Sequence, residues 1–190
     1  MLQWRVRQSR SICALVFVFL LLATSLGPIG QPAPASADVS PDIVLIIADD
    51  MNSDDWRALP HATAMLDAVF PNYIHTDPLC CPSRASIFTG LYPHNHGTWK
   101  TDPPEGGWPS FRNRESATIA TMLAKAGYRT GLIGKYMNNY EPRAGVRPGW
   151  DYWYAFGKPH YGGFRAVEGN NLVKSHRYST DMVTAKAKTF

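Results

Sequence analysis

A cysteine, a serine and an arginine stand close together in the segment 79–90, which reads LCCPSRASIFTG. Pro82 suits the first turn of a helix, because a backbone N–H is unpaired there in any case. In such a helix Arg84 lies one turn from Cys80 and can hold an anion beside it. The free N–H groups of the first turn add to the attraction for negative charge. The segment therefore predicts a nucleophile at the mouth of an anion site.

Two carboxylates, Asp49 and Asp50, follow the continuous apolar run 43–48. Such a run without alternation favours a strand covered on both faces, as in a parallel sheet. Ligand sites of open α/β sheets lie at the carboxyl ends of the strands, so the pair is well placed to bind a hard divalent cation through oxygen. The alternative is that the pair simply begins a loop.

A second strand is predicted over residues 128–133, followed by Gly134 and Lys135. Strands and helices in alternation, with polar residues after each strand, indicate an α/β fold with a parallel sheet. Lys135 is then expected at the same sheet edge as Asp49 and Asp50. The helix that begins at Pro82 should end near Gly90, a natural C′ residue.

The remaining segments give weaker signals. Residues 61–70 are compatible with an amphipathic helix, and Ser116 can cap a helix that ends at Gly127. Residues 99–114 read as a surface loop, and residues 181–190 as a helix. The aromatic-rich segment 141–165 favours irregular structure packed by its own rings over an aromatic-lined pocket. The predicted inward residues are Met65, Leu66 and Val69 in the helix over residues 61–70, and Ile119, Met122 and Leu123 in the helix after Ser116.

The first 37 residues are predicted to be a secretory signal peptide, cleaved after Ala37. Arginines 5, 7 and 10 precede a short apolar run, and Ala35-Ser36-Ala37 follows. This pattern favours export over the alternative of an N-terminal membrane anchor, because the run is shorter than a spanning helix needs. Without these three arginines the charge falls from +4 to 16 − 15 = +1, which gives no reason to expect nucleic-acid binding.

The cysteines of the remaining chain, Cys80 and Cys81, are adjacent, and neighbours could bridge only through a strained ring. An unpaired cysteine in an exported chain calls for a chemical role. A cysteine phosphatase is excluded, because the Cys-x5-Arg spacing is absent. A zinc site formed by Cys80, Cys81, His94 and His96 is a weaker alternative, since adjacent cysteines suit a tetrahedral ion poorly.

The pattern Cys80-x-Pro82-Ser83-Arg84, followed by Thr89-Gly90, resembles the sulfatase signature. The resemblance extends to Asp49-Asp50, Gly134-Lys135-Tyr136, Tyr92-Pro93-His94-Asn95-His96 and Trp150-Asp151-Tyr152, and it is closest to the N-acetylglucosamine-6-sulfatase branch. It covers about residues 42–190. It implies an α/β fold of the alkaline phosphatase/sulfatase type, here a partial parallel-sheet sandwich over residues 38–190.

The resemblance also implies residue roles. Cys80 is the precursor of formylglycine, and a formylglycine-generating enzyme carries out the conversion. The modified residue serves as nucleophile and metal ligand. Asp49 and Asp50 are further metal ligands, with Ca²⁺ as the expected ion, and Arg84 and Lys135 stabilise charge. The implied reaction is hydrolysis of sulfate monoesters on sulfated sugars, with glucosamine 6-sulfate as the branch's suggestion.

Two departures from the family stand out. Many sulfatases carry a histidine two residues after the lysine, where this sequence has Met137, and the next residue, Asn138, could bind substrate or cap a loop. The family's remaining metal ligands come from a later part of the sequence, so we expect an N-terminal fragment with little activity of its own. The alternatives are a phosphate or phosphonate ester hydrolase of the same superfamily, or an inactive domain.

Overall fold

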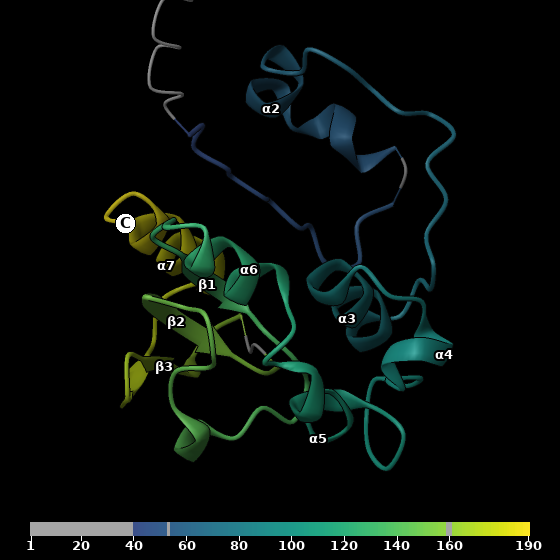
Figure 1. The fold of residues 1–190 in the computed structure, drawn as a ribbon. Helices are drawn as coiled ribbons and strands as arrows, with labels where there is room; N and C mark the ends of the chain where they lie inside the picture. The colour runs from purple at the N-terminus through teal and green to yellow at the C-terminus, as the bar shows by residue number, and fades with distance from the viewer. Residues whose placement is uncertain (1–39, 53, 159–160) are drawn as a thin grey trace, which may run out of the picture. The chain divides into compact units, whose positions relative to one another are not determined.

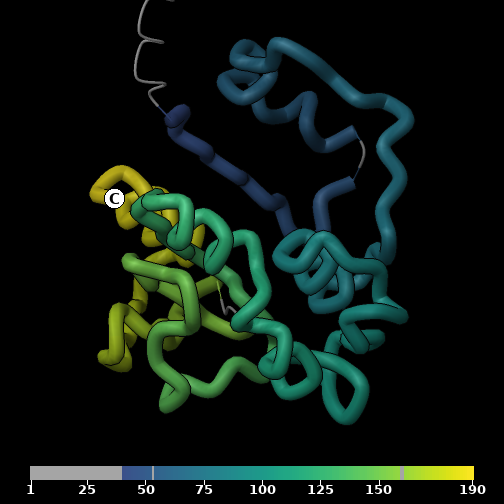
Figure 2. The backbone as a smooth tube through the Cα atoms, in the orientation of Figure 1, coloured from purple at the N-terminus to yellow at the C-terminus, as the bar shows by residue number. Residues whose placement is uncertain are grey.

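The computed structural model describes residues 40–52, 54–158 and 161–190. The chain divides after Ile47 into two units, which we describe separately. Residues 40–47 contain no helix or strand, and the helices and strands of the described residues all lie in the second unit (Figures 1 and 2). In order these are η1 (Asp55–Ala58), α2 (Pro60–Ala64), α3 (Cys80–Thr89), α4 (Pro93–His96), α5 (Gly107–Phe111), η2 (Arg112–Arg114), α6 (Ile119–Lys125), β1 (Gly131–Lys135), η3 (Pro142–Ala144), β2 (Tyr152–Phe156), β3 (Phe164–Glu168), β4 (Asn171–Ser175) and α7 (Ser179–Ala187).

The four strands form one sheet in the order β1-β2-β3-β4. Strands β1 and β2 are parallel, with Gly131 opposite Tyr152 and Lys135 opposite Phe156. The β2–β3 and β3–β4 pairs are antiparallel, so the sheet is mixed and the expected parallel arrangement holds for one pair. The α/β fold class is therefore confirmed, and β2 is the strand buried on both faces.

Alternation along the strands divides the core into two layers, because successive side chains of a strand point to opposite faces. On one face Ile133, Tyr154 and Phe156 pack with Met182 and Val183 of α7. The strand residues that alternate with these point to the other face. There they pack against side chains of α3, α5 and the segment 136–140. The larger residues of this second layer are Phe88, Trp108, Phe111, Leu132, Tyr136, Met137, Tyr140 and Trp153.

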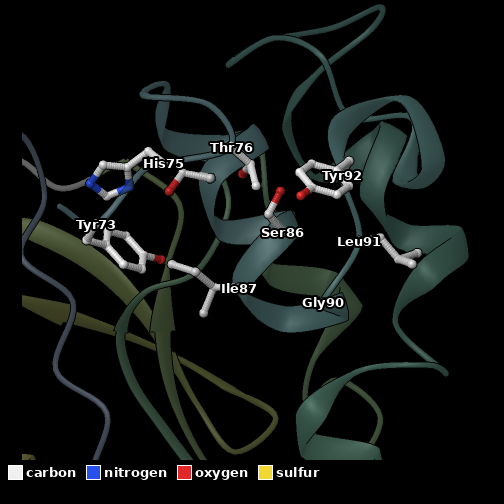
Figure 3. A pocket seen from close by; sticks show the side chains of 9 residues that line it. Tyr73, His75, Thr76, Ser86, Ile87, Gly90, Leu91 and Tyr92 are labelled. Atoms are coloured by element: carbon white, nitrogen blue, oxygen red, sulfur yellow. The ribbon is translucent and has the colours of Figure 1, made fainter. Parts of the chain in front are cut away.

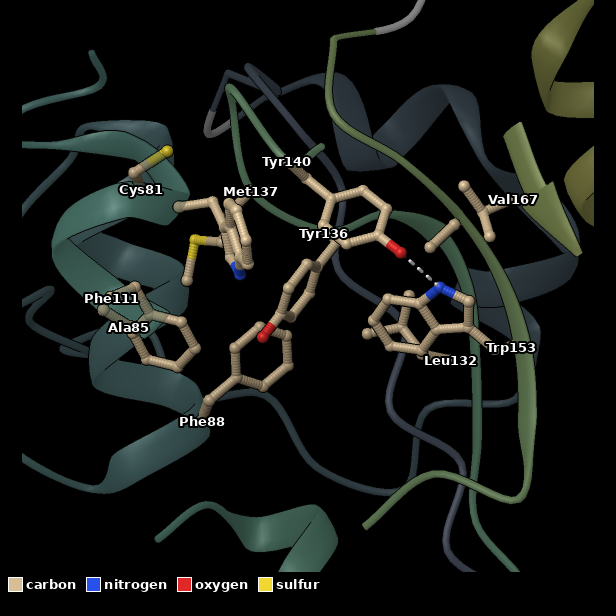
Figure 4. Packing of buried hydrophobic residues seen from close by; sticks show 12 residues of the cluster. Cys81, Ala85, Phe88, Phe111, Leu132, Tyr136, Met137, Tyr140, Trp153 and Val167 are labelled. Carbon is tan, nitrogen blue, oxygen red and sulfur yellow. Dashed lines mark hydrogen bonds between the residues drawn. The ribbon is translucent and has the colours of Figure 1, made fainter. Parts of the chain in front are cut away.

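Aromatic rings hold the second layer together (Figure 4). Tyr136 packs edge-on against Tyr140 and Trp153, with ring centroids 5.6 and 5.0 Å apart. The indole N–H of Trp153 donates to the Tyr140 hydroxyl at 3.1 Å. Such edge-to-face pairs contribute roughly 0.5–1.5 kcal/mol each beyond the burial of their area. The layer therefore fixes residues 136–140, the segment that directly follows Lys135.

The strand predicted over residues 43–48 is absent, and this prediction was wrong. Val44 and Ile46 keep 82% and 85% of their area exposed. An aliphatic run of this kind needs partner strands and cover on both faces, and within the described residues it has no strand partner. The carboxyl end of a strand therefore does not position Asp49 and Asp50 in this structure.

Two other predictions also fail in part. The helix predicted over residues 61–70 ends at Ala64, and its expected inward residues Met65, Leu66 and Val69 are exposed. So short a helix has little stability without a packing partner. Residues 99–114 are not all loop, because α5 and η2 form there and bury Trp108 and Phe111.

The cap and inward face predicted for the helix after Ser116 also differ. Thr118 caps α6 in a capping box with Thr121, whereas Ile119 and Met122 are exposed and Ala120 is buried. The helix predicted over residues 181–190 is present as α7 but ends at Ala187. The strand predicted over 128–133 is present as β1 but begins at Gly131 and includes Gly134 and Lys135. The aromatic segment 141–165 packs as expected but contains β2 and the start of β3, so it is not irregular throughout.

None of the described helices is both long and apolar enough to cross a membrane. The predicted signal peptide, residues 1–37, lies outside the described residues.

Candidate active site

Helix α3 begins at Cys80 and carries the predicted nucleophile in its first turn. Its N-cap, Leu79, is extended, with φ −77° and ψ 146°, and the helix ends at Gly90, whose φ of 69° is left-handed. Both the helix and its glycine stop were predicted, although the helix starts two residues before Pro82. Cys80 is partly exposed, whereas Cys81 is fully buried. The first of the two cysteines is therefore the accessible one.

Asp49 and Asp50 lie beside Cys80. One carboxylate oxygen from each aspartate and the sulfur of Cys80 lie within 4.8 Å of one another. Asp50 adopts a left-handed backbone conformation, with φ 56°, which a side chain with a β-carbon adopts at some cost. The three residues predicted as metal ligands are therefore brought together, although the strand expected to deliver the aspartates does not form.

Arg84 and Lys135 both bind Asp49. The guanidinium Nη2 of Arg84 lies 3.2 Å from one oxygen of Asp49, and the Lys135 Nζ lies 2.6 Å from the other. We call Asp49, Asp50, Arg84 and Lys135 the Asp49 cluster. Burial raises the pKa of Asp49, but the hydrogen bond from Lys135 and the charge of Arg84 outweigh it and hold that pKa below its usual value. For Lys135, burial lowers the pKa, but the hydrogen bond to Asp49 and its charge outweigh burial and hold that pKa above its usual value.

Arg84 is held from two sides and still has an unused donor. Its Nη1 donates to the backbone carbonyl of Lys135 at 2.7 Å, which joins α3 to the end of β1. Its Nε is buried without a hydrogen-bond partner among the described residues. A buried donor without a partner costs free energy, so it is a position where a bound anion would be favourable.

The backbone of Asn138 is held by two hydrogen bonds. Its N–H donates to the sulfur of Cys81 at 3.3 Å, and its carbonyl accepts the N–H of Trp108 at 2.8 Å. Its side-chain Oδ1 is buried and has no partner among the described residues. Burial raises the pKa of Cys81, so this sulfur stays a neutral acceptor. Met137, at the position where many sulfatases have histidine, is fully buried in the core.

A second charged group, which the sequence did not predict, surrounds Glu115. Its carboxylate accepts from the Trp108 indole N–H and the Tyr136 hydroxyl, both at 2.8 Å. It also binds Arg147 through Nη2 at 2.6 Å and Nε at 2.9 Å. We call Glu115, Arg147, Tyr136 and Trp108 the Glu115 cluster. Burial and the Glu115 charge raise the pKa of Tyr136 far above its usual value, so its hydroxyl remains a donor.

The histidines of the zinc alternative do not join the cysteines. Among the described residues, the one group with ligand atoms close enough to share an ion is Asp49, Asp50 and Cys80. His96 is buried and bonded to Ser86, while His94 is exposed and stacks on Tyr92. The sulfur of Cys81 accepts the hydrogen bond from the Asn138 N–H. The geometry therefore does not support a zinc site.

Comparison with known proteins identifies the family. A sequence profile described as Sulfatase matches residues 41–190. The chain is 32% identical over 189 residues to N-acetylglucosamine-6-sulfatase of Homo sapiens, which covers 90% of this chain and 33% of the relative. It is 37% identical over 119 residues to the extracellular sulfatase SULF-1 homolog of Drosophila melanogaster, over 60% of this chain and 10% of the relative. The crystal structure of yidJ from Bacteroides fragilis, a protein classed with the sulfatases, aligns with a TM-score of 0.52 over 67% of this chain and 33% of that chain, at 19% identity.

The chain belongs to the sulfatase family, because the family profile matches the sequence from residue 41 to residue 190. The resemblance to the N-acetylglucosamine-6-sulfatase branch is confirmed by the human relative, and the likeness to yidJ supports the expected fold. The chain spans a third or less of the length of each of these relatives. The substrate of the whole protein is therefore proposed below.

Proposed function

We propose that this chain carries the nucleophile and part of the cation and sulfate sites of a sulfuric ester hydrolase that acts on sulfated sugars. One observation carries the proposal: Asp49, Asp50 and Cys80 converge within 4.8 Å, while Arg84 and Lys135 bind the same Asp49 carboxylate. Attack on an anionic ester needs a nucleophile together with positive charge, and this point combines an accessible cysteine, two cationic side chains and acids that can hold a metal ion.

The nucleophile is proposed to be formylglycine at position 80. Its formation is a two-electron oxidation, in which the CH2–SH group and one water give an aldehyde, hydrogen sulfide, two protons and two electrons. An external oxidant such as dioxygen, used by the modifying enzyme, accepts the electrons. The hydrated aldehyde has two hydroxyl groups. In the first step, one hydroxyl attacks the ester sulfur, the bond between sulfur and the bridging oxygen breaks, and the alcohol leaves with a proton. In the second step, the other hydroxyl loses its proton, the bond between carbon and the sulfate oxygen breaks, and sulfate leaves as the aldehyde re-forms. A thiol has no second hydroxyl and therefore no such exit.

Arg84 and Lys135 are proposed to stabilise the negative charge of the sulfate group. The Nε donor of Arg84 is buried and has no partner within the part of the chain that the structure describes, so it can bind an oxygen of the ester without first breaking a hydrogen bond there. Lys135 can serve the oxygen on which charge develops as the alcohol leaves. Asn138, whose buried Oδ1 has no partner in the described ranges, is proposed to accept a hydrogen bond from the substrate or from a formylglycine hydroxyl.

Asp49, Asp50 and residue 80 are proposed to hold a divalent cation, with Ca²⁺ as the expected ion. Calcium–oxygen distances of about 2.3–2.6 Å allow two ligands of one ion to lie up to about 5 Å apart, so the 4.8 Å spread of these atoms fits. Conversion of Cys80 to a hydrated aldehyde would make the set all-oxygen, as a hard cation prefers. When bound, such an ion lowers the pKa of the attacking hydroxyl and neutralises sulfate oxygens.

The relatives' names support a proposal for the substrate class and the location. The human relative is an N-acetylglucosamine-6-sulfatase, and the Drosophila relative is an extracellular sulfatase. We propose a sulfated carbohydrate as substrate and an exported protein, with residues 1–37 as its signal peptide and residues 38–190 as part of the catalytic domain. A formylglycine-generating enzyme would be its modifying partner.

Coexpression of the chain with a formylglycine-generating enzyme tests the first requirement. Intact-mass analysis should show the loss of sulfur at position 80, and a hydrazide probe should label the new aldehyde. Cys80→Ala should abolish labelling, whereas the matched variant Cys81→Ala should keep it. An unmodified thiol at position 80 after coexpression would contradict the proposed nucleophile.

Competition between two matched aryl esters tests the reaction class. Any turnover of the sulfate ester should disappear in the Cys80→Ala variant. Removal of a preorganised charge-stabilising group should slow it by roughly 10²–10³-fold, which is the expected effect of Lys135→Ala. Faster hydrolysis of the phosphate ester than of the sulfate ester would move the assignment to the phosphate hydrolases of the same superfamily.

A further inference from the structure

A pocket of about 270 Å³ lies against α3, on residues that the proposed chemistry does not use. Its walls come from three places: the segment from Tyr73 to Thr76, one face of α3, and the turn that follows Gly90 (Figure 3). Ser83 and Ser86 of α3 line it, three and six residues after Cys80. With a rise of about 1.5 Å per residue, they lie about 4.5 and 9 Å along the helix axis from the proposed nucleophile.

The lining is uncharged but rich in hydroxyls and rings. Among the described residues, no Asp, Glu, Lys or Arg contributes to it. Two ring pairs stand at its walls: Tyr92 stacks on His94 with an interplanar angle of 6°, and Tyr73 meets His75 edge-on at 5.1 Å. Thr76, Ser83 and Ser86 add side chains with hydroxyl groups to the lining. Flat apolar faces with a few hydroxyls suit a neutral, hydroxylated ligand better than an ion.

The bond between Ser86 and His96 leaves the serine with a free donor. The N–H of Thr98 donates to His96 Nδ1 at 3.1 Å, so the ring proton of the neutral imidazole lies on Nε2. Nε2 is 3.1 Å from Ser86 Oγ and therefore donates to it. In this tautomer Ser86 keeps its own proton as a donor, and His96 does not accept that proton as a base. The pair consequently suits binding rather than a second nucleophilic site.

We propose that this pocket is a subsite for an uncharged saccharide unit, adjacent in a glycan chain to the sulfated unit. The inference rests on the proposed function, and it adds a division of labour along α3. The first turn takes the sulfate group, and the second and third turns take a neutral sugar ring through Tyr92 and the serine hydroxyls. The protein should accordingly prefer oligosaccharides to monosaccharides.

Binding of an unsulfated N-acetylglucosamine disaccharide to the 190-residue chain tests the subsite without any turnover. In a nitrogen-15 NMR titration, the amides of Thr76, Ser86 and Tyr92 should shift in a saturable way. Tyr92→Ala should weaken binding by about fivefold, the value of one ring contact. Tyr178→Ala is the matched control, because Tyr178 is also an exposed tyrosine with one ring partner but lies outside the pocket. That variant should bind like the parent.

Ser86→Ala provides a second variant if Tyr92→Ala alters the fold, and it should also weaken binding. Saturable shifts at the pocket that both variants reduce would support the inference. Absence of shifts, shifts confined to Asp49, Arg84 and Lys135, or equal binding by Tyr92→Ala and Tyr178→Ala would overturn it. Failure of the proposed function has a different signature, since an unmodified Cys80 or a preference for phosphate esters would leave disaccharide binding unchanged.

Discussion

The two charged clusters of this protein differ in how completely their hydrogen bonds are satisfied. In the Glu115 cluster, the carboxylate accepts from an indole, a phenol and a guanidinium, and it is 2% exposed. In the Asp49 cluster, the Asp49 side chain keeps 33% of its area exposed, and the Arg84 Nε has no partner among the described residues. Both clusters contain an arginine bound to an acid.

The comparison teaches how to tell a structural ion pair from a site. A buried charge that is fully paired holds a fold in place and has nothing left to offer a ligand. A partly open cluster with an unused donor keeps free energy available for binding. The Glu115 cluster also fixes Tyr136, the residue next to Lys135, so the closed cluster holds the open one in position.

The largest expected effect is loss of stability when the closed cluster is broken. Glu115→Ala leaves Arg147 without its counter-charge and two buried donors without an acceptor, so the free energy of unfolding should fall by about 3–5 kcal/mol. Urea denaturation followed by circular dichroism measures this. Glu105→Ala, which breaks an exposed pair with Lys100, is the control and should have little effect. Equal losses in the two variants would contradict the distinction between the clusters.

The next effect concerns anion binding at the open cluster. Arg84→Lys keeps the charge but removes the planar donor set, including Nε, so affinity for inorganic sulfate should fall by roughly tenfold or more, as expected for loss of charge-assisted hydrogen bonds worth about 1.5–3 kcal/mol. Isothermal titration calorimetry in the presence of a chelator measures the change. Arg143→Lys, at an exposed arginine of η3, should bind sulfate like the parent. Unchanged affinity in Arg84→Lys would show that Arg84 does not bind the anion.

A smaller effect, of opposite sign, is expected at Asp49. Two acids balance two cations in the Asp49 cluster, so removal of one negative charge in Asp49→Asn should strengthen sulfate binding in the chelated protein by about fivefold, equivalent to about 1 kcal/mol. Asp181→Asn, at an exposed residue of α7, controls for the change in net charge. Weaker binding by Asp49→Asn would mean that Asp49 is needed to orient Arg84 and Lys135.

The smallest effect is a dependence of stability on pH that comes from His96. Burial, followed by the charge of Arg114, lowers the pKa of His96 below 6.5, against a smaller opposing contribution from Asp77. The unfolded chain therefore binds more protons, so stability is complete above about pH 6.5 and falls as the pH drops through 6.5 toward the lower folded pKa. Urea midpoints at several pH values should show this slope. In His96→Gln that part of the slope should be missing; an identical slope in both proteins would assign it to other groups.

The sequence predicted those elements whose signals are local. Gly90 in its left-handed conformation ends α3 as expected, and β1 and α7 appear where aliphatic runs and a polar helix start indicated them. Predictions failed where structure depends on distant contacts. The run 43–48 has strand composition but no partner strand among the described residues, and α5 is too short for periodicity to reveal the burial of Trp108 and Phe111.

The candidate site shows the same division. Asp49, Asp50, Cys80, Arg84 and Lys135 were predicted from spacing and family resemblance, and the structure brings them together. Glu115 was missed, because a single glutamate in a loop carries no signal that an indole, a phenol and an arginine converge on it. The contact between Asn138 and Cys81 spans 57 positions in the sequence, so no local pattern could have indicated it.

The exposed run from Ile43 to Ile46 has a consequence for the protein in solution. It combines β-branched side chains with no charge and no proline, and its four aliphatic residues are each more than half exposed. Segments of this kind readily pair edge to edge with copies of themselves and begin aggregation. Asp42 on one side and Asp50 on the other flank the run, and charged residues in such positions limit this growth. Asp50, one of the acids proposed to bind a cation, is therefore also expected to help keep the chain dispersed.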